Sequence, residues 1–462
     1  MQKNMLPCVF KATLAVVFIP SLILPFTSSI AVAQTLAAQS SKLESNTFNL
    51  STSTQSTLTK VMREQRLTLA DALQLAIKFH PELSAAQKEI NATEGSLRQA
   101  GLPRNPEMTA IVEDPRGDSK TMTWQLSQAI ELGGKRSARV LIAESSLLAA
   151  KNDFAIMLSE VKAATTTGFY ELLIAQERER LAASSLALTQ RAFDAVKKQV
   201  TLGKVPPLEE TKARIAQASV QLELSQAVSE IAIARQKLFS MIGIKDDLPL
   251  QLIGQFDFMP GIPEKQDLER RLRSSPHFIK AQIEVEKRLA IANSERAKQI
   301  PDVTLSVGAK REQFAGQPTG RHQAIVGISV PLSLFDRNQG NVQESISRAD
   351  KAKDELASTE IRLRNDLSQA HLRLSSAHMT ASLMKNDVLP NAQNAFELAI
   401  KGFEFGKFNF LDVLDAQRSL LAAKNQYLRS CTEVHRAATD IQALVGDSAD
   451  QSLSLTPATG AF

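Results

Sequence analysis

The chain repeats itself, and this internal duplication constrains its fold more than any other feature of the sequence. Pro81 and Pro276 lie 195 residues apart in similar surroundings, and Pro106 and Pro301 keep the same spacing. Three further matches keep a spacing of 203 residues: Gln190 to Phe193 with Gln393 to Phe396, Gly203-Lys204 with Gly406-Lys407, and Ser240 to Gly243 with Ala443 to Gly446. The chain is therefore a duplication of a unit of about 200 residues.

Each half has the pattern of a helix, a β-hairpin, a very long helix, a turn and a further helix. A helix is predicted over residues 81–100 of the first half, since helix-ending residues follow it. Residues 137–200 contain no proline and a single glycine, which predicts one helix about 96 Å long. Apolar residues recur in it every seven positions, as in helices that pack side by side. The second half repeats this helix over residues 341–401, with a kink expected at Pro390.

Four segments alternate between apolar and polar residues, which predicts β-strands at about residues 107–114, 121–130, 302–311 and 322–332. Each segment is close to the length that crosses a bilayer at a tilt, and the polar faces carry small, mostly uncharged side chains. A half-buried sheet of a soluble domain is the alternative. Four strands are too few to close a barrel, and hydrocarbon does not tolerate unpaired strand edges. A membrane location therefore requires several copies of the chain.

The N-terminus has the pattern of an export signal. Lys3 and Lys11 precede an apolar run over residues 12–26, and the small residues of Ala31-Val32-Ala33 stand before Gln34. Removal of this segment also removes Cys8, and Cys431 alone cannot form an intramolecular disulfide. No later stretch has the roughly eighteen consecutive apolar residues of a membrane-spanning helix.

These patterns divide the chain into five parts. They are a signal peptide (1–33), a loose N-terminal segment rich in Ser, Thr and Gln (34–66), the first repeat (67–250), the second repeat (264–446) and a C-terminal tail (447–462).

The net charge of +5 does not indicate a nucleic-acid-binding protein, because basic residues alternate with acidic ones and form no block with interleaved aromatics. The six histidines form no cluster with metal-ligand spacing. No phosphate loop or nucleophile elbow is present. The sequence therefore predicts neither an enzyme nor a bound metal or cofactor.

Several short motifs are spread over about residues 67–446. They are Leu67-Thr68-Leu69, Pro81-Glu82-Leu83, Asn105-Pro106-Glu107, Ile130 to Arg136, Val330-Pro331-Leu332, Phe335 to Gly340 and Asp412 to Ala416. In these motifs the chain resembles the TolC family of outer-membrane efflux proteins, and more closely its CzcC-type heavy-metal efflux branch.

The resemblance implies a mainly α protein with a membrane β part. As a homotrimer it would form a twelve-stranded β-barrel in the outer membrane of a Gram-negative bacterium, over a long periplasmic α-helical barrel. Its partners would be outer-membrane lipid, a membrane-fusion adaptor and a proton-driven inner-membrane pump, and its cargo divalent heavy-metal cations. Export of drugs or secreted proteins is the alternative within this family. A periplasmic adaptor, an interaction protein, is the alternative outside it, but it predicts neither the duplication nor the strand pairs.

The resemblance also implies that the two helix-to-helix turns are periplasmic tips that meet the adaptor. The candidate docking residues are Gly203, Lys204, Gly406, Lys407, Phe403 and Phe408. The clustered aromatic residues have packing within the tip as their alternative role.

The resemblance further implies that Asp412, Asp415 and Glu209 stand at the positions of an acidic gate, where rings of carboxylates would favour cations. Asp412 has an alternative role as an acidic residue in the first turn of its helix. Phe408 stands where the family has a basic partner for the gate, so a salt-bridge latch is not expected.

Overall fold

The computed structural model describes residues 66–113, 119–243, 251–316, 320–405 and 407–446. The predicted signal peptide, nearly all of the N-terminal segment, the C-terminal tail and Gly406 lie outside the described residues. All described residues belong to one compact unit.

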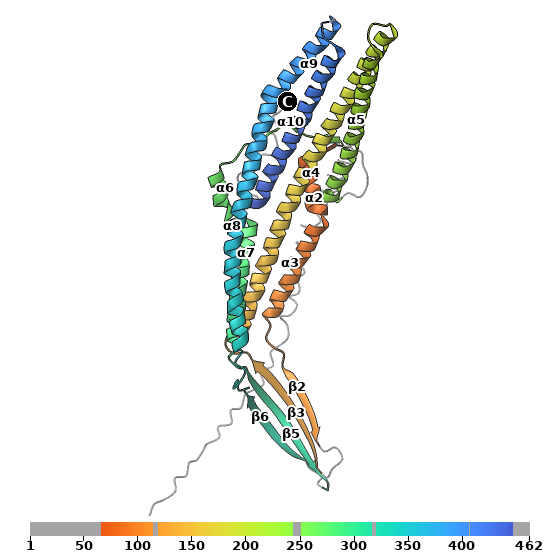
Figure 1. Ribbon diagram of the computed structural model, residues 1–462. Coiled ribbons are helices and arrows are strands. Elements are labelled where there is room, and N and C mark those ends of the chain that lie inside the picture. Colours follow the sequence, from red (N-terminus) through yellow and green to blue (C-terminus); the bar gives the residue numbers. More distant parts are fainter. Residues whose placement is uncertain (1–65, 114–118, 244–250, 317–319, 406, 447–462) are drawn as a thin grey trace, which may run out of the picture. The chain divides into compact units, whose positions relative to one another are not determined.

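Helices make up most of this unit (Figure 1). They are α2 (Leu69–Phe79), α3 (Pro81–Ala100), α4 (Lys135–Thr201), α5 (Pro207–Ile242), α6 (Lys265–Leu272), α7 (Pro276–Ala297), α8 (Gln339–Leu383), the π-helix η1 (Met384–Val388), α9 (Leu389–Glu404) and α10 (Phe410–Val445). None of the described helices is both long and apolar enough to cross a bilayer. The sequence did not predict α2 and α6, nor the short parallel pair of β1 (Arg66–Thr68) with β4 (Gln251–Ile253).

The long helix predicted over residues 137–200 is α4, which extends it by a few residues at its start. The second long helix is interrupted as expected near Pro390, and the interruption is the π-helix η1. Pro390 lies in the first turn of α9. Proline has no amide hydrogen, and a residue in the first turn of a helix needs none for the hydrogen bonds within that helix. The extra residue of a π-turn thus lets α8 and α9 continue as one bent column.

The helices stand side by side in four columns of the described structure (Figure 1). Helix α4 contacts α3 and α5 on one side, and α7 and α10 on the other. Helix α8 contacts both α7 and α10, and α9 continues it along α10. One column is the long helix α4, and another is α8 continued through η1 into α9. The other two columns are pairs of shorter helices, α3 with α5 and α7 with α10. The edge columns are α3 with α5 and α8 with α9.

Buried side chains lie where these columns meet. One extensive cluster joins α8 to α10 through Leu367, Leu374 and Ile441, and it includes Leu268 of α6. Small residues such as Ala370 and Ala438 let the two helix backbones approach closely. The core is thus a series of helix-to-helix seams.

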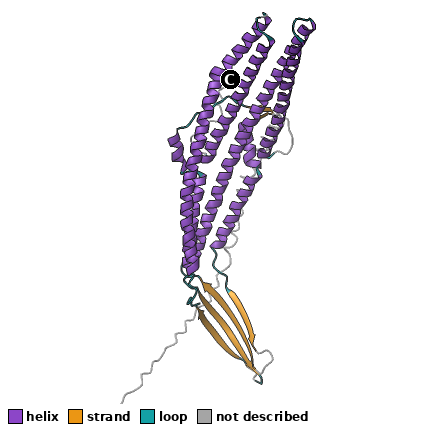
Figure 2. Ribbon diagram, in the orientation of Figure 1, coloured by secondary structure: helices purple, strands orange, loops and turns teal. Residues whose placement is uncertain are grey.

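The strands form one antiparallel sheet in the order β2-β3-β5-β6 (Figure 2). They are β2 (Glu107–Glu113), β3 (Ser119–Ile130), β5 (Val303–Phe314) and β6 (Arg321–Ser329). The order of the strands follows the order of the helices to which they connect, α3, α4, α7 and α8. Strand β6 ends before its predicted end at about residue 332, because Pro331 has no amide hydrogen to donate to a neighbouring strand. Within the described residues, β2 and β6 each have one unpaired edge.

The register places the apolar residues of all four strands on one face. Val326 lies opposite Val307, which lies opposite Leu126, which lies opposite Met108. Residues directly opposite each other share a face of the sheet. The apolar face holds Met108, Ala110, Val112, Met122, Trp124, Leu126, Ile130, Val303, Leu305, Val307, Ala309, Ala324, Val326 and Ile328. The other face is mainly Thr, Ser, Gln and Gly, with Ile111 and Ile325 as apolar exceptions and with charged residues such as Glu113, Lys310 and Glu312 toward the hairpin end.

Candidate functional site

The first tip turn joins α4 to α5 and depends on Gly203. Its φ angle is 70°, in the left-handed region that favours glycine. The amide of Gly203 donates to the carbonyl of Val200 at 2.9 Å, and that of Lys204 donates to Gln199 at 2.9 Å. These two bonds are the Schellman arrangement that ends a helix. A Cβ at Gly203 would meet no atom within 4 Å, so the glycine serves the backbone conformation.

The second tip turn repeats the first. The amide of Lys407 donates to the carbonyl of Gly402 at 2.8 Å, which matches the bond from Lys204 to Gln199 at the repeat spacing of 203. The Phe408 ring lies directly on Gly402, where a Cβ would clash with it. Phe405 is 77% exposed, whereas Phe403 packs into the helices. The predicted aromatic cluster is therefore partly tip packing and partly exposed surface.

An apolar cluster joins the two tip hairpins within one chain. Val196 of α4, Ala213 of α5 and Leu414 of α10 are buried together, and Phe403 of α9 packs against them. Further from the tips, the buried Gln417 side chain donates to the Thr189 hydroxyl at 2.8 Å. The tips are thus held side by side.

The acidic residues predicted for a gate have different surroundings. The amide of Asn409 donates to the Asp412 carboxylate at 2.8 Å, so Asp412 caps the start of α10. Asp415 is exposed one turn further on and has no ion pair among the described residues. Glu209 pairs with Lys212 of its own helix at 3.0 Å. Because Val413 and Leu414 are buried, Asp412 and Asp415 share the outward face of α10.

The structure brings together a charged network that the sequence did not predict, at the joint between helices and sheet. The Glu131 side chain is 8% exposed and accepts hydrogen bonds from both terminal nitrogens of Arg139, at 2.5 and 3.1 Å. Asp302 pairs with Lys135 at 2.5 Å. Arg104 bridges the two acids, at 3.5 Å from Glu131 and 3.4 Å from Asp302. The network therefore ties the first half of the duplication to the second.

The two carboxyl groups of this network are held in their charged forms. The hydrogen bond from Arg139 lowers the pKa of Glu131, against burial, and the nearby charge of Arg104 adds to the effect. Burial raises the pKa of Asp302, but its bonds to Lys135 and to the Leu132 amide outweigh burial and leave its pKa lowered. Both acids therefore stabilise the joint as carboxylates.

Left-handed residues start the long helices at this joint. Gly134 precedes α4 with a φ of 74°, and Asn338 precedes α8 with a φ of 59°. A Cβ at the neighbouring Gly133 would lie 2.9 Å from the Ile300 side chain, so this backbone passes too close for another residue. The side-chain amide of Asn338 donates a hydrogen bond to the Glu295 carboxylate at 2.8 Å. The motifs from Ile130 to Arg136 and from Phe335 to Gly340 contain these residues and were the available signal.

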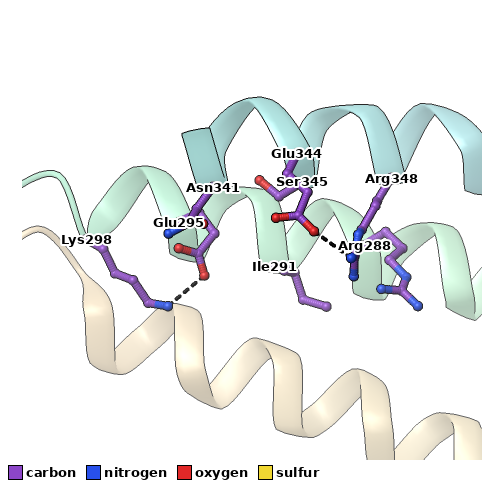
Figure 3. Close-up of a pocket in the computed structure, with 8 residues that line it drawn as sticks. All are labelled: Arg288, Ile291, Glu295, Lys298, Asn341, Glu344, Ser345 and Arg348. Atoms are coloured by element: carbon purple, nitrogen blue, oxygen red, sulfur yellow. Dashed lines mark hydrogen bonds and ion pairs between the residues drawn. The ribbon is translucent and has the colours of Figure 1, made fainter. Parts of the chain in front are cut away.

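A pocket of about 340 Å³ lies between α7 and α8 (Figure 3). Its charged side chains pair mainly within their own helices, as Lys298 does with Glu295 and Arg348 with Glu344. No group of three or more metal-binding side chains occurs in the part of the chain that the structure describes.

Buried titratable groups between α4 and α10 have packing roles. The His435 ring stacks on Tyr170 with centroids 3.5 Å apart, and burial lowers the pKa of His435 to about 4. Burial also raises the pKa of Cys431 to about 11, which leaves it as an unreactive thiol.

Comparison with known proteins places this geometry among efflux channels. The family model described as outer membrane efflux protein matches residues 72–244 and 268–447, one segment in each half. The cobalt-zinc-cadmium resistance protein CzcC of Cupriavidus metallidurans is 41% identical over 82% of this chain and 90% of its own length. The nickel-cobalt-cadmium resistance protein NccC of Alcaligenes xylosoxydans xylosoxydans is 24% identical over 62% of this chain and 65% of its own.

Solved structures share the fold. A crystal structure of CusC aligns with this chain with a TM-score of 0.70. CusC is the name of a cation efflux system protein of Escherichia coli. The alignment covers 82% of this chain and 92% of CusC at 17% identity. CusC forms a transmembrane channel.

Proposed function

The chain belongs to the outer membrane efflux protein family, and we propose that it is the outer-membrane channel of a tripartite system that exports divalent heavy-metal cations. The identity of the exported ions is inferred from the similarity to a cobalt-zinc-cadmium resistance protein over nearly the whole of that protein's length. The partners of this channel are a periplasmic adaptor and an inner-membrane pump. In this scheme residues 1–33 are the export signal, and residues 67–250 and 264–446 are the two repeats of the working channel.

The sheet supports a membrane location for the strands. Its apolar face is exposed, with Val326 80% and Ile328 71% accessible to solvent in the single chain. Strand β3 has twelve residues, enough for about 40 Å along the strand and about 30 Å across a bilayer at a tilt near 40°. The unpaired edges of β2 and β6 would pair between copies, and three copies would close a barrel of twelve strands.

The two edge columns of helices support the same assembly. Each presents apolar residues at coiled-coil spacing that no described element covers. On α5 they are Leu208, Ile215 and Leu222, and on α8 they are Ile361, Leu372, Met379 and Leu383. All are more than half exposed in the single chain. Because the two sets lie on opposite edge columns, copies can join edge to edge around a ring.

The tips and the acidic residues complete the proposal. The turns at Gly203 and at 405–409 are the docking surface for the adaptor, which exposed Leu202 and Phe405 support. Asp415, and secondarily Asp412, would face the central passage and attract cations. Glu209 contributes less, because Lys212 neutralises it.

Deletion of the gene tests the cargo. The deletion strain is expected to become several-fold more sensitive to zinc, cobalt or cadmium in growth assays, because the periplasm then lacks its exit for these ions. Sensitivity to hydrophobic drugs should be unchanged. A plasmid copy of the gene should restore metal resistance. Normal metal tolerance combined with new drug sensitivity would instead assign the channel to drug export.

Native mass spectrometry in mild detergent tests the assembly. The purified chain should run as a trimer, and combined Ile361→Glu and Met379→Glu substitutions should yield monomers, because charges would have to be buried between helices. Arg362→Glu is the matched control, since the neighbouring position points about 100° away from the seam. A monomeric parent protein, or equal loss of trimers in the control, would contradict the proposed interface.

A further inference from the structure

Three basic side chains interrupt the apolar face of the sheet at its hairpin end. Arg311 lies opposite Met122 on one side and His322 on the other, so it shares their face. Lys120 precedes Met122 by two positions on β3 and therefore points the same way. All three side chains are exposed. We call Lys120, Arg311 and His322 the basic patch.

Among the residues that the structure describes, the basic patch has no acidic partner on its own face. The acids at this end of the sheet, Glu113 and Glu312, occupy the opposite face, where Lys310 pairs with Glu312 at 2.8 Å. Among the described residues, no ion pair involves any member of the patch. Lys310 on the polar face is therefore paired with an acid, whereas the three cations on the apolar face have no such partner among the described residues.

The row of residues below the basic patch marks a boundary. Trp124, Ala309 and Ala324 form this row, and Leu126, Val307 and Val326 form the next. Tryptophan is the side chain that favours the interface between hydrocarbon and headgroups. A cation on a lipid-facing strand costs about 2–4 kcal/mol at the bilayer centre but little near the interface. The basic patch thus lies at headgroup level, at the end of the sheet remote from the helices.

We propose that the basic patch binds the phosphate groups of a phosphorylated glycolipid in the outer leaflet of the outer membrane. This rests on the proposed function, which puts the helices in the periplasm and the hairpins outside. Arg311 supplies a planar fork that can hold two phosphate oxygens, and Lys120 supplies a compact point charge. The apolar rows below accept the acyl chains of the same lipid. Binding would anchor the sheet at a defined depth.

Lipid binding by the purified trimer tests this proposal, with lipid A as the probe and phosphatidylglycerol as the comparison. Native mass spectrometry would count lipid A bound to the parent protein and to a variant with Lys120→Gln, Arg311→Gln and His322→Gln. The triple variant is expected to bind at least about tenfold less lipid A. The matched control is Lys310→Gln with Arg321→Gln, which removes neighbouring cations from the polar face of the same strands and should bind normally.

Three results would overturn the proposal: equal lipid A binding by the parent and the triple variant, an equal loss in the control, or equal binding of phosphatidylglycerol and lipid A by the parent. Membrane fractions and metal resistance of the same strains separate this proposal from the function. A triple variant that resides in the outer membrane, supports metal resistance and still binds lipid A removes the lipid site alone. A parent chain absent from the outer membrane removes both.

Discussion

Replacing Glu131 by alanine is expected to remove most of the assembled channel from the membrane fraction. The nearly buried Glu131 carboxylate forms a bidentate ion pair with Arg139 and lies beside Arg104. Its loss leaves Arg139 unneutralised at the point where β3 turns into α4. The expected cost is on the order of 2 kcal/mol, between the values for exposed and buried pairs. Thermal unfolding of the purified protein and the trimer yield would measure it.

Controls separate this pair from a general loss of charge. Glu144→Ala removes an exposed acid of α4, the helix that carries Arg139, and should leave the unfolding temperature unchanged. A double-mutant cycle between Glu131→Ala and Arg139→Ala should give a coupling energy well above zero. Strictly additive effects would contradict the pair as the origin of the stability.

The same network has a defined pH dependence. The pKa of Glu131 is lowered in the folded protein. The contribution of its carboxylate to the free energy of unfolding is therefore complete above the ordinary pKa of a glutamate, and it is lost as the pH falls through the pKa that Glu131 has in the folded protein. Glu131→Gln should therefore weaken the protein at neutral pH and flatten its loss of stability below about pH 4.5. An unchanged acid profile in this variant would assign the effect to other carboxyl groups.

Asp415→Asn is expected to reduce the preference of the channel for cations roughly threefold or more. Asp415 is exposed and unpaired among the described residues, and three copies around one passage would place three carboxylates close together. At a Debye length of about 8 Å such a ring still acts on an ion in a narrow bore. Reversal potentials in a planar bilayer with a salt gradient would measure the change.

Asp412→Asn should have the smaller effect, because the Asp412 carboxylate accepts the Asn409 amide at the start of α10. An asparagine oxygen can still accept that bond, so the fold is retained while the charge is lost. Asp194→Asn, which removes an exposed carboxylate from α4, serves as the matched control. Equal losses for Asp194 and Asp415 would show that selectivity comes from the general charge of the helices.

Local patterns in the sequence were sufficient for the long helices and for the four strands of the antiparallel sheet, but not for α2, α6, β1 and β4. The absence of proline over residues 137–200 predicted α4, and period-two alternation predicted strands whose register then placed the apolar residues on one face. The repeat spacing predicted two tip turns, and both have the same amide-to-carbonyl bond. These features follow from residues that are near each other in the chain, or from the comparison of one half with the other.

Only the tertiary structure decided which distant residues meet. Lys135 and Asp302 are 167 residues apart, and no periodicity relates a lysine at the start of one helix to an aspartate before a strand in the other half. The role of Asp412 also needed coordinates, since a first-turn acid and a gate carboxylate look alike in sequence. Helix and strand periods report which face a residue takes. They do not report which neighbour covers that face, because that depends on the packing order of the columns.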